Sequence, residues 1–309
     1  MPSHIFTRLG YWDESAATNE RAWQASESDV KRAGEPGTLR DFHSLNYLQY
    51  AYLQLGRYRN ARRTLDIVAA QYDALTDKKT APDTPELQSR HARGRTIYAI
   101  PDRVVYGYFD MLTRYAVETQ DWDAAANIPL LMPSLDFVAV KLQLEAMAAA
   151  AREDVAGALL AEEPGQHPFV RQIITMQAKE AEALAAKASG NAVGAVAKMR
   201  EAVAIEDSID SISQPPYPII PANELFGTLL MELNRPADAN ERFLQALKRT
   251  PGRPRAIYGI AQAAQASGDM ATAQQRYQEF LALWKNADAD RPEVATAKEF
   301  LAKVPVLPH

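Results

Sequence analysis

The chain contains the stretch LMELNRPADANERF at Leu230–Phe243, and the stretch AQASGDMATAQQRY at Ala264–Tyr277 has the same pattern. In each stretch a turn-forming residue, Asn234 or Gly268, is followed five positions later by alanine and nine positions later by an aromatic residue. The two turn residues lie 34 positions apart, a common period of repeats that consist of two antiparallel helices. We therefore expect the end of one helix, a tight turn and the start of a second helix in each stretch.

The residue types suit this geometry. Asparagine and glycine tolerate the left-handed backbone conformation that ends many helices. The alanine five positions later, Ala239 or Ala273, lets the second helix approach the first closely, and Phe243 or Tyr277 then fills the remaining gap. The stretches thus predict two packed helix pairs.

The spacing of turn residue and small residue recurs four more times, at longer and unequal intervals. The six pairs are Gly10 with Ser15, Gly56 with Ala61, Gln120 with Ala125, Gly190 with Ala195, Asn234 with Ala239, and Gly268 with Ala273. Because the other intervals between successive turn residues are longer than 34 positions, we expect extra loops or helices between these pairs.

This pattern resembles the tetratricopeptide repeat (TPR) superfamily. The opening phrase MPSHIFTRLGYWDES at residues 1–15 is similar to a phrase found within a family of longer, mostly uncharacterised bacterial TPR proteins. Further similar phrases are Tyr50–Gly56, Arg114–Ala116 ahead of Asp121-Trp122, and Pro221–Leu225. The resemblance implies a right-handed α-solenoid of TPR-like helix-turn-helix pairs with irregular insertions. It also implies a scaffold that binds a protein or peptide, because such arrays bind other proteins far more often than they catalyse reactions.

Composition agrees with an all-α fold. With 309 residues, 47% of them hydrophobic and 24% charged, the chain can bury a sizeable core and is neither disordered nor membrane-spanning in composition. Alternating β-branched runs between turn dipeptides are missing, so no strand is expected. The absence of cysteine excludes disulfides, thiolate metal sites and cysteine nucleophiles. A net charge of −5 argues against a general nucleic-acid binder.

We expect one solenoid over residues 1–309. Its parts are an N-terminal repeat pair (1–75), an insertion (76–102), central irregular helical pairs (103–212), a C-terminal repeat pair (222–285), and a capping helix with a tail (286–309). Between them, Ser213–Pro221 is rich in proline and should be extended. Helices are predicted at residues 3–9, 13–33, 39–55, 59–75, 86–99, 103–119, 122–131, 135–151, 153–161, 168–189, 192–207, 222–233, 236–249, 254–267, 270–285 and 291–303.

Only nine residues precede Gly10, whereas the first helix of such a repeat has about 14 residues. The first repeat is therefore short, or the chain is part of a longer protein. Either way, we expect exposed apolar surface on this repeat, where an upstream neighbour would pack. Homodimerisation there is one option. We expect a cytoplasmic location, and whether an upstream segment or signal peptide is missing stays open.

The resemblance also implies a concave surface lined by the first helix of each repeat. Counting back from the turn residues along these helices, and including Arg8, gives partner-binding residues His4, Arg8, His43, Asn46, Tyr50, Leu53, Arg114, Glu224, Arg255 and Tyr258. The same count adds Thr7, Gly107, Asp110, Val117, Pro221, Thr228, Met231, Gln262 and Gln265. Apolar groups of a peptide would pack on Tyr50, Leu53 and Tyr258, while Asn46, Arg114 and Arg255 would orient it.

Three alternatives remain. His4 and His43 fall at matching positions of adjacent first helices, so they could form a metal-dependent site, a small-molecule site or a proton switch, although simple hydrogen bonding is the favoured reading. The basic clusters Arg57–Arg63 and Arg90–Arg95 could contact RNA, but a solvated helix face is favoured. Self-assembly through the first repeat is the third alternative.

Asp121 and Asp123 fit helix capping better than paired catalytic carboxylates. We expect no catalytic residue, metal or cofactor.

Overall fold

A computed structural model describes residues 2–76, 100–128, 140–141, 143–145, 147–148, 168–209 and 220–304. All regular structure in these ranges is helical and none is strand, which confirms the all-α prediction. The elements are α1 (Pro2–Leu9), α2 (Trp12–Ala33), η1 (Gly37–Leu39), α3 (Phe42–Gln54), α4 (Tyr58–Thr76), α6 (Ile100–Thr119), α7 (Trp122–Ala126), α9 (Pro168–Ala188), α10 (Ala192–Ser208), α11 (Ala222–Glu232), α12 (Pro236–Arg249), α13 (Pro254–Ala266), α14 (Met270–Leu283) and α15 (Pro292–Lys303).

Most of these helices lie within two or three residues of their predicted bounds. The helix predicted at 39–55 begins later, at Phe42, because the Asp41 carboxylate accepts a hydrogen bond from the backbone N–H of Ser44 (3.1 Å) and caps it. Pro101 lies in the first turn of α6, where proline is tolerated. The helices predicted at 86–99 and 153–161 lie outside the described residues, as do most of the helix at 135–151 and of the extended segment at Ser213–Pro221.

All six predicted turn residues have the left-handed backbone conformation. Their φ angles are 73° at Gly10, 67° at Gly56, 58° at Gln120, 79° at Gly190, 56° at Asn234 and 82° at Gly268. The small residues five positions later are at most 1% exposed, at Ser15, Ala61, Ala125, Ala195, Ala239 and Ala273. The local helix-turn-helix geometry predicted from the spacing is thus present in all six copies.

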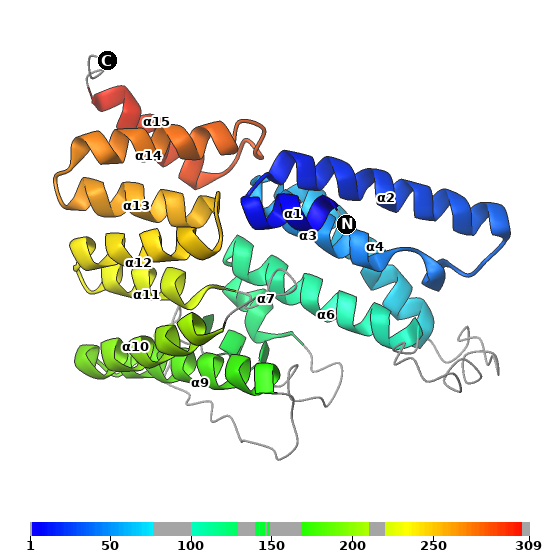
Figure 1. Ribbon diagram of the computed structural model, residues 1–309, viewed down its shortest axis with the longest axis horizontal. Coiled ribbons are helices and arrows are strands. Elements are labelled where there is room, and N and C mark those ends of the chain that lie inside the picture. Colours follow the sequence, from blue (N-terminus) through cyan, green and yellow to red (C-terminus); the bar gives the residue numbers. More distant parts are fainter. Residues whose placement is uncertain are drawn as a thin grey trace.

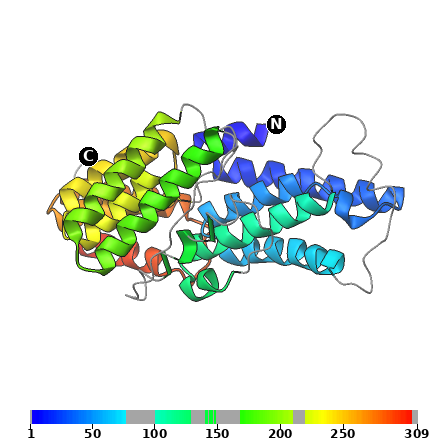
Figure 2. The ribbon, with the colours of Figure 1, turned by 90° about the horizontal axis from the view of Figure 1, so that it is seen from below.

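The helices form two groups that lie side by side (Figures 1 and 2). In the first group, α1 to α4 pack with α6. In the second, helices from α9 to α15 stack in chain order, and consecutive helices pair most closely as α9 with α10, α11 with α12, and α13 with α14. None of the helices in the described ranges is long and apolar enough to cross a membrane.

The two groups contact each other through residues that are far apart in the sequence. The indole N–H of Trp12 donates to the carbonyl of Gly252 (2.7 Å), and that of Trp284 donates to the carbonyl of Gln54 (2.9 Å). The turn at Gly10 is so close to the second group that a Cβ atom on it would lie 2.1 Å from the carbonyl oxygen of Pro251. The first two repeats therefore fold back onto the last two, a contact that an open ribbon of repeats does not predict.

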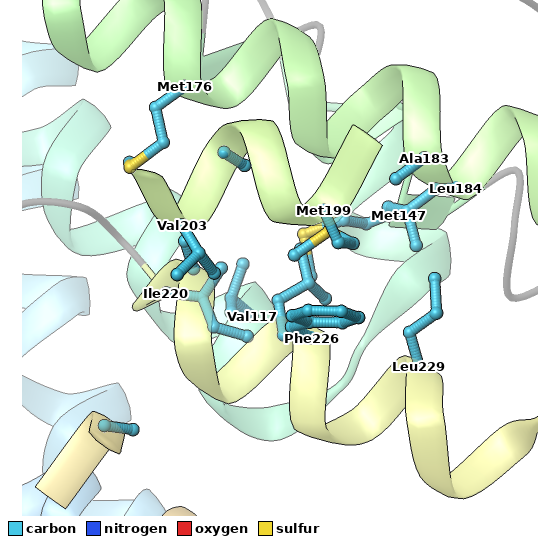
Figure 3. Packing of buried hydrophobic residues seen from close by; sticks show 14 of the residues in the cluster. Val117, Met147, Met176, Ala183, Leu184, Met199, Val203, Ile220, Phe226 and Leu229 are labelled. Carbon is cyan, nitrogen blue, oxygen red and sulfur yellow. The ribbon is translucent and has the colours of Figure 1, made fainter. Parts of the chain in front are cut away.

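Two apolar cores follow from this arrangement. One joins α6 and α7 to α9–α13, with Val117, Met199 and Phe226 among its residues (Figure 3). The other joins α2–α4 to α13–α15 through residues such as Trp12 and Trp284. Since the second core combines both ends of the chain, the contact between the groups is buried and apolar.

Candidate binding groove

A cavity of about 460 Å³ lies where the two groups meet. We call it the central groove. Five groove positions counted from the sequence line it: Leu53, Thr228, Arg255, Tyr258 and Gln262. Its other walls come from α4, α7, α9, α12, α14 and α15, and they include Tyr58, Trp122, Leu184, Lys187, Phe243, Phe280, Trp284 and Glu293.

The groove offers two kinds of contact. Trp122 of α7 and Tyr258 of α13 are partly exposed aromatic residues on its walls. Gln120 and Gln262 are exposed on its walls, and a side-chain amide both donates and accepts hydrogen bonds, as a peptide bond does. Walls that combine apolar side chains with a few hydrogen-bonding groups are typical of ligand-binding cavities.

Charges in the groove are balanced by near neighbours. Lys187 Nζ lies 2.6 Å from Glu232 Oε2, and Arg291 Nε lies 3.5 Å from Glu293 Oε2. Arg255 donates from Nη2 to the backbone carbonyls of Val117 (3.1 Å) and Glu118 (3.0 Å). These contacts hold Arg255 at the groove wall, where its side chain keeps 22% exposure.

A buried ion cluster lies behind the groove, centred on Arg253. This guanidinium is 1% exposed and pairs with two carboxylates that are almost fully buried, Glu118 (3.0 Å) and Glu224 (2.9 Å from Nη2 to Oε1). It also donates to the hydroxyl of Tyr50 (3.2 Å), while Gln54 donates to Glu118 (3.0 Å). The cluster joins α3 and α6 to the segment between α12 and α13.

The electrostatics keep this cluster charged. Burial alone would raise the pKa of Glu118, but the positive charges of Arg253 and Arg255 outweigh it and lower that pKa. Burial alone would likewise lower the pKa of Arg253, yet the charges of Glu118 and Glu224 hold it well above its ordinary value. Glu118 and Arg253 therefore remain ionised at neutral pH.

Several predicted partner-binding residues lie in this interior instead of on an open surface. Tyr50, Arg114 and Glu224 are at most 4% exposed. Arg114 donates to the side-chain oxygen of Asn46 (2.6 Å), so these two residues bind each other. The expectation that a partner would pack on Tyr50 and be oriented by Arg114, with Glu224 also on the binding surface, is corrected here. The count assumed that nothing covers the first helices of the second, third and fifth repeats.

His4 and His43 contact each other, as their matching positions on adjacent first helices suggested. Nε2 of His4 lies 3.0 Å from Nε2 of His43, and the ring of Tyr47 stacks on His4 with centroids 4.6 Å apart. Burial, followed by the nearby charges of His43 and Arg8, lowers the pKa of His4. Neither histidine lines the central groove, and Arg8 is exposed on α1 away from it. Across the described ranges, no three histidine or acidic side chains gather closely enough to hold a metal ion.

Two further alternatives are also clarified. Asp121 caps α7 by accepting from the backbone N–H of Ala124 (3.0 Å), as predicted. Arginines of the first basic cluster pair with carboxylates: Arg57 with Asp13 (2.7 Å), Arg59 with Asp290 (3.3 Å) and Arg62 with Asp66 (2.8 Å). This pairing weakens the case for an RNA-binding patch. The second basic cluster, Arg90–Arg95, lies outside the described residues.

Sequence reasoning missed Arg253 and Trp122 as important residues. Arg253 lies between Gly252 and Pro254, just before a helix, and is therefore not at a counted position of the repeat. Trp122 lies two positions after the turn at Gln120, which is not a counted position either. The available signal for Arg253 was its position between a glycine and a proline. Glycine permits unusual backbone geometry, whereas proline restricts it.

Comparison with known proteins gives no match: no family model, no curated protein and no solved structure matches this chain.

A second buried acidic group lies in the stack, outside the groove. Glu180 of α9 is 0% exposed, accepts a hydrogen bond from Gln143, and has no partner within the described residues for its other oxygen. Burial and the charge of nearby Glu206 raise its pKa well above the ordinary value. Burial also raises the pKa of Glu206, although that carboxyl accepts from the backbone N–H groups of Ala222 (2.9 Å) and Asn223 (3.1 Å).

We expect Glu180→Gln to stabilise the protein increasingly as the pH rises. Because the pKa of Glu180 is higher in the folded state, the wild type loses stability as the pH rises from the ordinary glutamate pKa toward the raised one, by at most about 1.4 kcal/mol per pH unit. Glutamine does not ionise, so the variant avoids this loss. Urea unfolding followed by circular dichroism between about pH 5 and pH 8 tests this. Parallel curves for the two proteins would contradict it, and exposed Glu241→Gln is the control.

Proposed function

We propose that the protein is a TPR-like α-solenoid scaffold that binds a peptide or a partner helix in the central groove. The observation that carries this proposal is the cavity itself, with partly exposed Trp122 and Tyr258 and with the exposed amides of Gln120 and Gln262. Aromatic side chains contribute much of the binding energy at protein interfaces. A stable complex would bury about 1,200–2,000 Å², so the partner would extend from the groove onto neighbouring helices.

A binding role is favoured over a catalytic one for a physical reason. The ionisable groups on the groove walls include Lys187 and Glu232, which neutralise each other, and Glu118, which is held in the ionised form by two arginines. A general acid or base needs a pKa near the working pH, and lowering the pKa of Glu118 moves it away from that range.

We expect the double variant Trp122→Ala/Tyr258→Ala to lose partner binding. Peptides would first be selected on the immobilised wild type from a displayed random library, and their affinities measured by fluorescence anisotropy. Truncating two contact aromatics should weaken binding by about 2 kcal/mol or more, close to a thirtyfold rise in Kd. Tyr11→Ala is the matched control, since Tyr11 is 53% exposed and does not line the groove. Selected peptides that bind the double variant as tightly as the wild type would disprove the proposal.

A second candidate, self-association through α1, is supported by a specific observation. Ile5, Leu9 and Tyr11 are 60%, 49% and 53% exposed, so the apolar surface expected on the first repeat is present. The positions that match Ile5 in three other repeats, five residues before the turn, are at most 1% exposed at Ala51, Leu229 and Ala263. Ile5 thus differs from these three equivalents in being exposed.

We expect this surface to give a weak, concentration-dependent dimer, because a stable one needs about 800 Å² from each partner and α1 has only eight residues. Light scattering after size exclusion should show an average mass above 34.2 kDa at high concentration. Ile5→Glu/Leu9→Glu should restore the monomer mass. A monomer mass for the wild type at all concentrations would exclude this candidate.

A further inference from the structure

The contact between α1 and α3 brings together two imidazole groups whose residues are 39 positions apart. Nε2 of His4 and Nε2 of His43 are separated by 3.0 Å. Tyr47 contacts both rings, with centroid distances of 4.6 Å to His4 and 4.9 Å to His43, and it is itself only 4% exposed. The tyrosine therefore fixes the two rings from the buried side, while His43 is exposed on the other.

We propose that this histidine pair binds one divalent first-row transition-metal ion, of the class that prefers imidazole nitrogen: Cu²⁺, Ni²⁺ or Zn²⁺. Two nitrogen ligands at about 2.0–2.1 Å from such an ion lie about 2.8 Å apart at a square-planar angle and about 3.4 Å apart at a tetrahedral angle. The observed separation of 3.0 Å falls between these values. The two rings now face each other nearly head-on, with centroids 5.2 Å apart. Replacing the shared proton by a metal ion therefore requires the rings, above all the exposed ring of His43, to turn so that both nitrogens point at the ion.

The chemistry of the chain is consistent with this ion class. No cysteine is present to compete as a softer ligand. Because no third histidine or acidic ligand lies close by in the described ranges, water would complete the coordination shell. The charge of Arg8, which acts on His4, opposes a cation, so we expect micromolar rather than nanomolar affinity.

Binding would fasten α1 to α3. An ion that binds the folded protein and has no equivalent site in the unfolded chain stabilises the fold by mass action. The metal would thus hold in place the helix that carries the exposed residues Ile5 and Leu9. This inference does not depend on the central groove, which lies elsewhere.

Calorimetric titration of the tag-free full chain with CuSO₄, NiCl₂ or ZnCl₂ alone tests the proposal. We expect one site in the wild type that His43→Asn weakens by at least about tenfold. His167→Asn and His309→Asn are the matched controls and should retain this site. Electron paramagnetic resonance of the Cu²⁺ form should show two imidazole nitrogens in the wild type and fewer in His43→Asn.

Equal stoichiometry and affinity in the wild type and His43→Asn would overturn the proposal and leave the pair as a hydrogen bond only. Circular dichroism of His43→Asn establishes that the variant folds, as expected for an exposed side chain. If it does not fold, the nitrogen count from the wild-type spectrum decides: two imidazoles support the site, and fewer than two reject it.

Discussion

Arg253→Met should lower the free energy of unfolding by about 3–5 kcal/mol, because it removes the cation closest to two buried carboxylates. Only the longer ion pairs with Arg255, at 3.7 Å from Glu118 and 3.9 Å from Glu224, then remain. In the wild type, Glu118 and Glu224 are at most 4% exposed and both pair with this guanidinium. Methionine has a similar length but no charge, so packing is largely kept while the ion pairs are lost. Urea unfolding monitored by circular dichroism measures the difference.

Two further variants make this result interpretable. Arg32→Met removes an exposed pair with Asp29 (2.7 Å) and should change stability by less than about 0.5 kcal/mol. Adding Glu224→Gln to Arg253→Met removes one of the unpaired charges and should recover part of the loss. A loss below about 1 kcal/mol for Arg253→Met would show that water or structural relaxation compensates the carboxylates.

Phe243→Ala should cost about 3–5 kcal/mol, the second large effect. The ring lies between the backbones of α11 and α13: a Cβ atom on Gly227 or on Gly259 would lie 2.6 Å from it. Because neither glycine has a side chain that can move into the space, truncation should leave a cavity. Thermal and urea unfolding test this, with Leu244→Ala as a control, since Leu244 is 37% exposed on the same helix.

The same geometry predicts a coupling between ring and glycine. Gly227→Ala should destabilise the wild type, since the added methyl group overlaps the ring. In the Phe243→Ala background the methyl group has room, so the same substitution should cost much less. Equal costs in both backgrounds would contradict the packing described for Phe243.

The local structure could be predicted from the sequence because its signals are local. A glycine or asparagine that ends a helix and a small residue five positions later act within one turn, and they located even the unusual Gln120 with φ of 58°. Counting along the first helices also found Arg255 and Tyr258 at the groove.

The contact between the two groups of helices could not be predicted in this way. It depends on pairs such as Trp12 with Gly252, whose residues are 240 positions apart, and no periodic pattern encodes such a pairing. Once the groups meet, Tyr50 and Glu224 become interior residues. Counting back from the turn residues thus predicted groove residues best on first helices that no other part of the chain covers.

The residues that join the two groups of helices lie far apart in the sequence, and this has a consequence for synthesis on the ribosome. Trp12 and Trp284 find their carbonyl partners 240 and 230 residues away. At a translation rate of about 5–20 residues per second, the first helices wait roughly 10 to 50 s before their partners emerge. During that interval the apolar side chains that later join both ends remain uncovered, so the nascent chain needs protection from aggregation until its last helices are complete.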